Sequence, residues 1–379
     1  MRNPTELIEL ANNSGHRKAT LKSSKLLALA IMAGMFIAFG AIFFTTVTSY
    51  GGNPGAVKLM GGLVFSLGLV LVVLAGAELF TGNNLMVISL MNKKIKFKDL
   101  CRNWFLVYIG NLVGSLLVVL LMFASKQYLQ DSSVVGLKAI NIAEAKVGLD
   151  FSTAFVRAIL CNILVCLAIW LTMVAKSISG KVLGIIFPIS AFVAIGYEHS
   201  VANMYFVPMG IMIKKLAPTI FWEQIGSTSS SYTNLEFSNF VIDNLIPVTL
   251  GNIVGGVFFV GMIYWFIHKE ESNDIFSHVL DKDGNRYCAK LFVDASGTNG
   301  VISKKVGLLG EHYSLATGVE YNVKYLGNPN EMHLMIGKIY GGGYGWIFPL
   351  KNERAIIGFG TLDKKITKEL KGRLNKIIE

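Results

Sequence analysis

Charge is scarce in this chain of 379 residues, where 16% of residues are charged and 53% are hydrophobic. An average soluble domain carries about 25% charged residues. The deficit excludes two or three ordinary soluble domains, because much of the surface must face something other than water. The net charge of +11 comes from basic residues between apolar runs. That distribution is typical of membrane proteins and argues against a nucleic-acid partner.

Cysteine is also scarce, with 4 in the chain. No Cys-x-x-Cys pair or metal-ligand spacing occurs, so we predict neither a disulfide nor a metal site. The chain also lacks the pattern of a cleavable signal peptide, because about 25 mostly polar residues precede the first apolar stretch.

Long apolar runs are abundant, and six are long enough to cross a bilayer as helices, which takes about 20 residues. They are Leu26–Val47, Val57–Met91, Trp104–Ala124, Phe151–Ala175, Val182–Ile213 and Phe240–Ile267. Lys and Arg are about twice as frequent on the flanks that include the N-terminus as on the opposite flanks. We therefore expect a multi-pass protein of the cell (inner or plasma) membrane with both termini in the cytoplasm.

The second and fifth runs are longer than a bilayer needs, and each carries polar residues midway. Gly76–Asn83 interrupts the second run and Gly196–Asn203 interrupts the fifth. Helices broken at membrane depth fit this pattern, because their non-helical backbone lines a cavity. The two breaks also align at one constant offset, through Gly76, Glu78, Asn83 and Val87 with Gly196, Glu198, Asn203 and Val207.

A second pair of motifs extends this alignment, since Gly110–Gly114 in the third run matches Gly251–Gly255 in the sixth. Spans one to three and four to six therefore read as one unit used twice. Because three is odd, the second copy is inverted. The predicted fold is an all-α membrane protein whose broken second and fifth helices meet near the midplane.

His199 is the strongest candidate functional residue, because it alone among the His residues lies deep within a span. Intramembrane ionisable groups are costly and usually functional. An imidazole can donate a hydrogen bond to an anion and exchange a proton near neutral pH. The alternative is a neutral His that is hydrogen-bonded to backbone at the break.

Other residues near the breaks have expected roles of a more structural kind. Carboxylates lining an anion pore would repel its substrate, so we predict that Glu78 and Glu198 face away from it and accept hydrogen bonds from free backbone N–H groups. Thr81 and Asn83 could donate to a ligand or cap the second half-helix. Apolar residues near the breaks could form a constriction, and they are Phe65, Leu69, Leu79, Phe80 and Phe192.

The runs Ala77–Gly82, Cys161–Cys166 and Gly196–Met204 resemble the formate/nitrite transporter family, and the resemblance covers residues 1–268. It implies an aquaporin-like fold, a homopentamer with one pore per protomer, and passage of formate, nitrite or hydrosulfide. By motif position it implies a central pore His at His199, a vestibule Lys at Lys146 and a pore Asn at Asn162. It further implies a flexible loop and apolar slits, at Leu79, Phe80 and Thr81 and at Phe65, Leu69 and Phe192. Asn203 lies beside the second break, where we expect a structural role.

These observations predict a channel or carrier in the lipid bilayer for a small monovalent weak-acid anion. Formate is the leading candidate, with nitrite and hydrosulfide as alternatives and with proton coupling through His199. The domain needs no cofactor and has no enzymatic role in this interpretation.

Charged residues return in residues 272–379, where we expect a small soluble α+β appendage on the cytoplasmic side. Ala289–Val293 and Arg354–Gly360 read as strands and Asp363–Glu379 as a helix. Val293–Gly297 and Gly342–Pro349 resemble an internal fragment of geranylgeranyl reductase-type flavoproteins. The Gly-x-Gly-x-x-Gly motif that an FAD site needs is missing. We therefore predict a non-functional fragment, and a membrane-tethered FAD-dependent reductase is the alternative.

Overall fold

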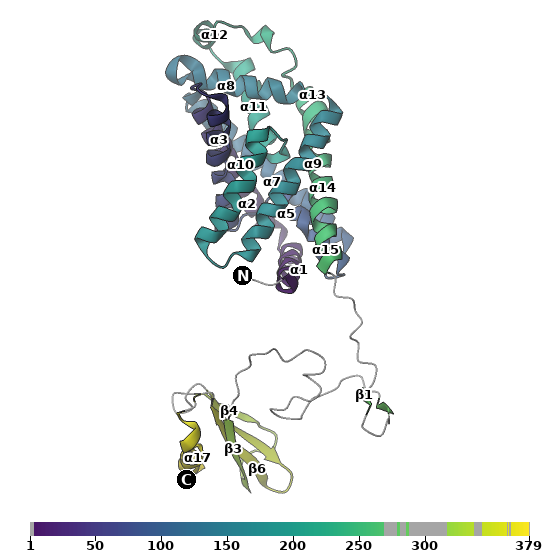
Figure 1. Cartoon of the computed structure of the whole chain (residues 1–379), viewed down its shortest axis with the longest axis vertical. Coiled ribbons are helices and arrows are strands. Elements are labelled where there is room, and N and C mark those ends of the chain that lie inside the picture. The colour runs from purple at the N-terminus through teal and green to yellow at the C-terminus, as the bar shows by residue number, and fades with distance from the viewer. Residues whose placement is uncertain are drawn as a thin grey trace. The chain divides into compact units, whose positions relative to one another are not determined.

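The computed structural model describes residues 4–268, 279–280, 286–287, 317–336, 343–361, 363 and 365–378. The chain divides into two compact units, Met1–Glu271 and Ser272–Glu379. The first is helical and the second contains the strands (Figure 1).

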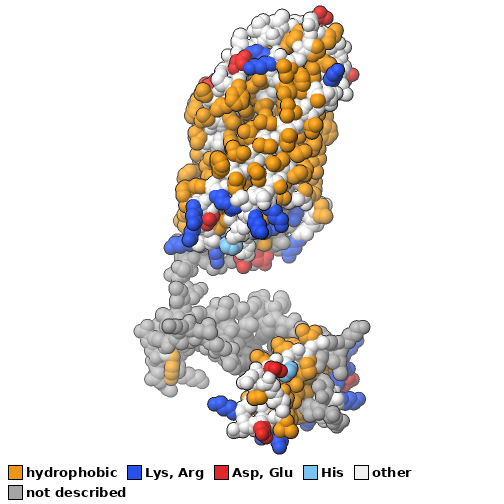
Figure 2. Space-filling model, turned by 180° about the vertical axis from the view of Figure 1, so that it is seen from behind, with side chains coloured by type: hydrophobic (Ala, Val, Ile, Leu, Met, Phe, Trp, Pro, Cys, Tyr) orange, Lys and Arg blue, Asp and Glu red, His pale blue; other side chains and the backbone are white. Residues whose placement is uncertain are grey.

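Within residues 4–268, six helices are long and apolar enough to cross a membrane, which confirms the six predicted spans. They are α2 (Ser23–Thr48), α3 with α4 (Pro54–Phe65 and Leu67–Ala75), α7 (Phe97–Ala124), α9 (Phe151–Val174), α10 (Ile178–Ile195) and the segment Phe237–His268. Hydrophobic side chains cover the flank of this unit in Figure 2, and Lys and Arg gather toward its ends. Exposed side chains such as Phe105, Phe187 and Phe266 are therefore expected to meet lipid or another protomer.

The last span is less regular than the sequence suggests. It consists of α13 (Phe237–Asn239), a π-helical segment η4 (Phe240–Leu245), α14 (Ile246–Gly256), a second π-helical segment η5 (Val257–Met262) and α15 (Ile263–His268). π-helical turns inside α-helices often lie at functional sites. Here they flank α14, which carries the second Gly-Asn motif.

An N-terminal helix, α1 (Pro4–Thr20), was not expected from the polar composition of this segment. Its apolar side buries Leu7 and Ala11. Its polar side is fixed to the end of the second span, because Ser89 Oγ donates to the Asn12 carbonyl at 3.1 Å. Gly15 is required at the crossing, since a Cβ there would lie 2.0 Å from Ser89 Oγ.

The two halves of the unit repeat the same order of elements. Helix α8 (Gln130–Val147) corresponds to α1, and these helices lie at opposite ends of the unit (Figure 1). After the breaks, α5 (Phe80–Asn83), η1 (Asn84–Met86) and α6 (Val87–Met91) correspond to α11 (Ser200–Leu216). The connectors contain η2 (Gln127–Leu129), α12 (Thr219–Ile225) and η3 (Ser229–Ser231).

Glycines allow the same close helix crossing in each half. A Cβ on Gly114 would lie 2.0 Å from the Ile31 carbonyl oxygen, and one on Gly255 would lie 2.3 Å from the Ile159 carbonyl oxygen. The matched Gly-Asn motifs therefore press α7 onto α2 and α14 onto α9.

The second unit contains a four-stranded antiparallel sheet of order β3-β6-β5-β4. The strands are β3 (Thr317–Lys324), β4 (His333–Met335), β5 (Tyr344–Leu350) and β6 (Arg354–Thr361), and a separate pair joins β1 (Val279–Leu280) to β2 (Arg286–Tyr287). After a turn η8 (Thr367–Glu369), helix α17 (Leu370–Ile378) packs Leu370 and Leu374 on Phe359.

This sheet confirms the strand predicted at Arg354–Gly360. The final helix begins at Leu370, later than predicted, because Asp363 forms a turn in which its carboxylate accepts from the Lys365 N–H at 2.8 Å. The strand predicted at Ala289–Val293 lies outside the described residues.

Candidate functional site

Both predicted helix breaks are present, and each begins at a glycine. Gly76 ends α4 with φ of 75° and Gly196 ends α10 with φ of 84°. A Cβ would meet nothing within 4 Å at either position. Glycine is therefore needed for the left-handed backbone and not for space. The chain is non-helical until Phe80 and Ser200, where the second half-helices begin.

Asn111 of α7 holds the first break through three hydrogen bonds. Its Oδ1 accepts from the Phe80 N–H at 2.9 Å, and its Nδ2 donates to the carbonyls of Ala30 at 2.8 Å and Glu78 at 3.0 Å. The amide thus pairs backbone groups that the missing helical turn leaves free.

Asn252 of α14 does the same at the second break. Its Oδ1 accepts from the Ser200 N–H at 2.9 Å, and its Nδ2 donates to the carbonyls of Ala158 at 2.8 Å and Glu198 at 3.0 Å. The prediction assigned backbone pairing to the glutamates, and it was wrong because these two asparagines already supply it. The signal was available, since each Asn is the second residue of a Gly-Asn motif.

Glu78 instead belongs to a side-chain network with a lysine from α1. Lys18 Nζ lies 2.8 Å from Glu78 Oε2 and donates to Asn83 Oδ1 at 2.7 Å. Asn83 Nδ2 donates to Glu78 Oε2 and to Asn103 Oδ1, both at 2.8 Å. Asn103 Nδ2 donates to the Lys18 carbonyl at 3.2 Å, which closes the network.

Glu198 has the same network at the opposite end. Lys146 Nζ lies 3.0 Å from both Glu198 carboxylate oxygens. Asn203 Nδ2 donates to Glu198 Oε2 at 2.7 Å and to Asn244 Oδ1 at 2.8 Å. Asn244 Nδ2 donates to the Lys146 carbonyl at 2.9 Å.

Two cavities lie on either side of the breaks. One of about 220 Å³ is lined by Lys18, Glu78 and Leu79 among others, and we call it the α1 cavity. The other, of about 230 Å³, is lined by Lys146, Glu198 and residues of the second break, and we call it the α8 cavity. The glutamates were expected to face away from the pore. They line these cavities instead, and their paired lysines neutralise the repulsion on which that expectation rested.

His199 and Thr81 connect the two breaks directly. The His199 Nδ1 accepts from the Ala202 N–H at 3.0 Å, which caps α11. In a neutral ring the proton then sits on Nε2, and that nitrogen lies 3.0 Å from Thr81 Oγ1. The ring is 3% exposed and lines the α8 cavity. His199 is thus hydrogen-bonded to backbone, as the alternative interpretation of this residue expected. Its Nε2–H nevertheless remains a donor that is directed at the other break.

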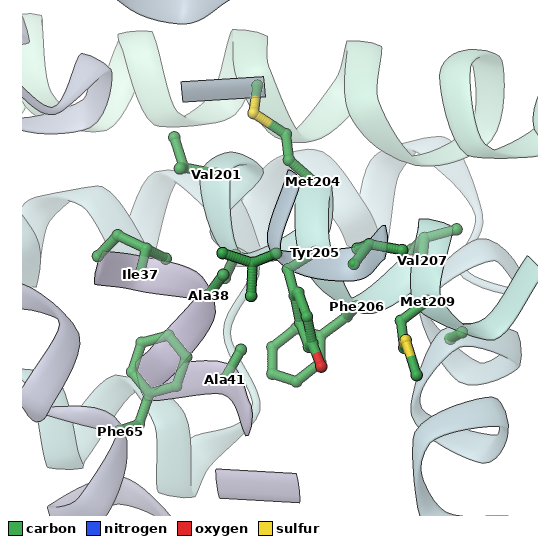
Figure 3. Close-up of a cluster of buried hydrophobic side chains, with 14 of the residues drawn as sticks. Ile37, Ala38, Ala41, Phe65, Val201, Met204, Tyr205, Phe206, Val207 and Met209 are labelled. Carbon is green, nitrogen blue, oxygen red and sulfur yellow. The ribbon is translucent and has the colours of Figure 1, made fainter. Parts of the chain in front are cut away.

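Aromatic rings form the wall of the α8 cavity beside His199. The Phe65 and Phe192 ring centroids are 5.9 Å apart, and Phe192 stacks on His199 at 6.0 Å. Phe206 lines the same cavity and stacks on Phe65 at 6.4 Å, and Figure 3 shows these two rings with Ile37 and Ala41. Sequence reasoning missed Phe206, because nothing distinguishes it from other membrane phenylalanines.

The remaining constriction candidates lie elsewhere. Leu79 lines the α1 cavity. Leu69 is buried in the main core and lines neither cavity described above. Phe80 also lines neither, because its ring packs edge-on against Trp104 and Tyr108, with centroids 6.1 and 4.9 Å away.

Asn162 lies behind the breaks rather than on a cavity wall. Its Nδ2 donates to the carbonyls of Thr81 at 3.3 Å and Asn252 at 2.6 Å. Its Oδ1 is buried and has no hydrogen-bond partner among the described residues. The side chain therefore fixes the backbone that carries Thr81.

This unit is a six-span inverted repeat in which a hydrogen bond joins the two broken helices. One cavity lies on each side of that contact. Together these features define a membrane channel protein. The formate/nitrite transporter family model matches residues 5–266. The chain belongs to that family. It is 42% identical over 272 residues to the formate channel FocA of Escherichia coli (strain K12), a match that covers 71% of this chain and 95% of that protein.

Other relatives and solved structures agree with this assignment. The formate channel FocA of Haemophilus influenzae (strain ATCC 51907 / DSM 11121 / KW20 / Rd) is 40% identical, covering 70% of this chain and 94% of that protein. A structure described as a pentameric formate channel with formate bound has a TM-score of 0.61 and 46% identity, covering 65% of this chain and 98% of that one. An FNT family ion channel has a TM-score of 0.60 and 31% identity, covering 69% and 99%. The flavoprotein resemblance of residues 272–379 is not borne out.

Proposed function

We propose that each protomer forms a pore for formate between the α8 cavity and the α1 cavity, with His199 and Thr81 at the crossing point. The observation that supports this proposal most directly is the 3.0 Å contact between His199 Nε2 and Thr81 Oγ1, which joins the two broken helices. The names of the relatives support formate as the substrate. Nitrite and hydrosulfide are the competing substrates, because both are small and monovalent.

The crossing point has the chemistry that an anion requires. Passing the apolar rings of Phe65 and Phe192 removes water from the substrate, which costs several kcal/mol for a bare charge even after relaxation. The His199 Nε2–H can leave Thr81 and donate to the anion. The N-terminus of α11, a helix of 17 residues, adds a positive partial charge from its aligned backbone dipoles.

Two transport modes use the same groups. In the first, the anion passes while His199 and Thr81 supply hydrogen bonds and Asn162 holds the Thr81 backbone. In the second, desolvation near His199 raises the pKa of the substrate, which takes a proton there and crosses as neutral acid. In both modes Lys146 contacts the anion once it is inside the α8 cavity.

The proposal includes assembly and orientation. Five copies form the active protein, as the description of the pentameric neighbour suggests. The protein lies in the inner or plasma membrane with both termini in the cytoplasm, an orientation that the excess of Lys and Arg near the N-terminus supports. Residues 272–379 take no part in transport, because every candidate pore residue precedes Ile267. They bind no flavin, because the Gly-x-Gly-x-x-Gly motif of an FAD site is missing.

Uptake into proteoliposomes tests the proposal. Vesicles containing the full chain should take up formate in a saturable manner, and a chain ending at residue 271 should keep the same rate if its thermal transition is unchanged. Bound-flavin absorbance in the purified protein would favour the reductase alternative. Saturable uptake of nitrite or hydrosulfide without formate uptake would overturn formate as the substrate.

A further inference from the structure

The lysine at each cavity has a partner that cancels most of its field. Lys146 Nζ lies 3.0 Å from both Glu198 oxygens, and Lys18 Nζ lies 2.8 Å from Glu78 Oε2. A charge pair acts at a distance as a dipole, whose potential falls off faster than that of a single charge. These lysines can contact an anion that is already inside, but they attract a distant anion weakly.

Each cavity also contains an arginine without such a partner. Arg157 lines the α8 cavity and Arg17 lines the α1 cavity. Both are exposed, and among the described residues neither side chain has a hydrogen bond or an acidic partner within 4.0 Å. Each cavity therefore carries one net positive charge beyond its neutralised Lys–Glu pair.

The inverted repeat does not relate the positions of these two arginines to each other. The Arg157 carbonyl accepts from the Glu198 N–H, and the Leu29 carbonyl accepts from the Glu78 N–H, so Leu29 is the counterpart of Arg157. Arg17 precedes Lys18 as Ala145 precedes Lys146, and Ala145 also lines the α8 cavity. The two halves thus place their arginines at non-equivalent positions, yet each cavity receives one.

We infer that Arg157 and Arg17 collect the substrate anion at the two cavities, each from its own face of the membrane. This inference rests on the proposed function and specifies which charges determine the apparent affinity. Each guanidinium group adds a positive charge that no acidic neighbour cancels, so its attraction for an anion reaches farther than that of the Lys–Glu pair. Lys146 and Lys18 then act after capture, beside the breaks.

Right-side-out and inverted membrane vesicles of cells that express the full chain can test this, because they expose opposite faces. At low ionic strength, Arg157→Gln should raise the half-saturation concentration for formate about fivefold from one face, with the maximal rate unchanged. Arg17→Gln should do the same from the other face only. About 0.5 M salt should reduce both effects below about twofold, because screening shortens the reach of the charge.

Two controls make the outcome specific. Arg157→Lys keeps the charge and should restore the parent curve to within about twofold, because long-range attraction depends on the charge and not on the shape of the group. Lys126→Gln removes an exposed charge from the connector after α7 that lines neither cavity, and should change nothing. Parent-like curves for Arg157→Gln from both faces at low salt would overturn the inference. Absence of saturable formate flux in the parent would overturn the proposed function, and the inference with it.

Discussion

The two helix breaks have the same scaffold and different contents. Asn111 and Asn252 make matching hydrogen bonds, and Lys18 and Lys146 make matching contacts to a glutamate. The first break has Leu79 at the position that corresponds to His199 in the second break. The second break has Val201 at the position that corresponds to Thr81 in the first. The repeat therefore supplies the framework, while the proposed crossing point, formed by His199 and Thr81, lies where the halves differ.

The largest effect that we expect concerns the framework. Asn252→Ala should lower the free energy of unfolding by about 3 kcal/mol, because three hydrogen bonds are lost and buried backbone groups stay unpaired. Asn111→Ala should cost about the same. Thermal unfolding of the detergent-solubilised protein measures both, with Asn234→Ala, an exposed asparagine, as the control. A large difference between the two variants would contradict equivalent breaks.

Smaller, matched effects should follow from the two ion pairs. Double-mutant cycles of Lys18→Met with Glu78→Gln and of Lys146→Met with Glu198→Gln should each give a coupling energy of about 1–2 kcal/mol, because both pairs are largely buried. The single glutamate variants should be less stable than the doubles, since they leave a lysine without its partner. A coupling energy of zero at one pair but not at the other would contradict the equivalence of the two ion pairs.

The smallest effect that we expect concerns an ion-pair cluster in the connector before the last span. Glu236 bonds to Lys214 at 2.6 Å and to Lys215 at 3.2 Å in the second half, and these lysines hold the pKa of the Glu236 carboxyl below its usual value. Because the folded pKa is the lower one, the stabilisation is present above the unfolded pKa and is lost as pH falls through the folded value. The difference in thermal transition between parent and Glu236→Gln should therefore shrink between about pH 6 and pH 3. A difference that stays constant across this range would exclude the ion pair as its cause.

Sequence patterns predicted the spans, the breaks and the repeat well, because each has a local physical cause. Length and apolar content mark the spans, and Gly76 and Gly196 mark the breaks because only glycine adopts that backbone easily. The pairing of His199 with Thr81 joins residues 118 positions apart. A hydropathy pattern carries no information on such a contact.

Other parts of the site were missed because their cause is tertiary. Lys18 lies in a segment whose composition reads only as polar, and its role depends on Glu78 being 60 positions away. A comparison of Lys18–Leu21 with Lys146–Leu149 could have found it, since both run from Lys to Leu over the same spacing. Phe80 was assigned to a constriction because it is an apolar residue near the first break, but its ring packs on Trp104.

The central claim is that one residue from each half, His199 and Thr81, forms the crossing point. Formate flux, current and internal acidification recorded together in vesicles test it most directly, for the parent, Thr81→Val, His199→Asn and His199→Phe. Thr81→Val copies the residue of the other half and should lower flux about tenfold, the factor that the loss of one buried hydrogen bond allows. His199→Phe should abolish proton-coupled uptake, and His199→Asn should abolish acidification and leave an anion current. Parent-like flux in Thr81→Val, together with parent-like acidification in His199→Asn, would contradict the account.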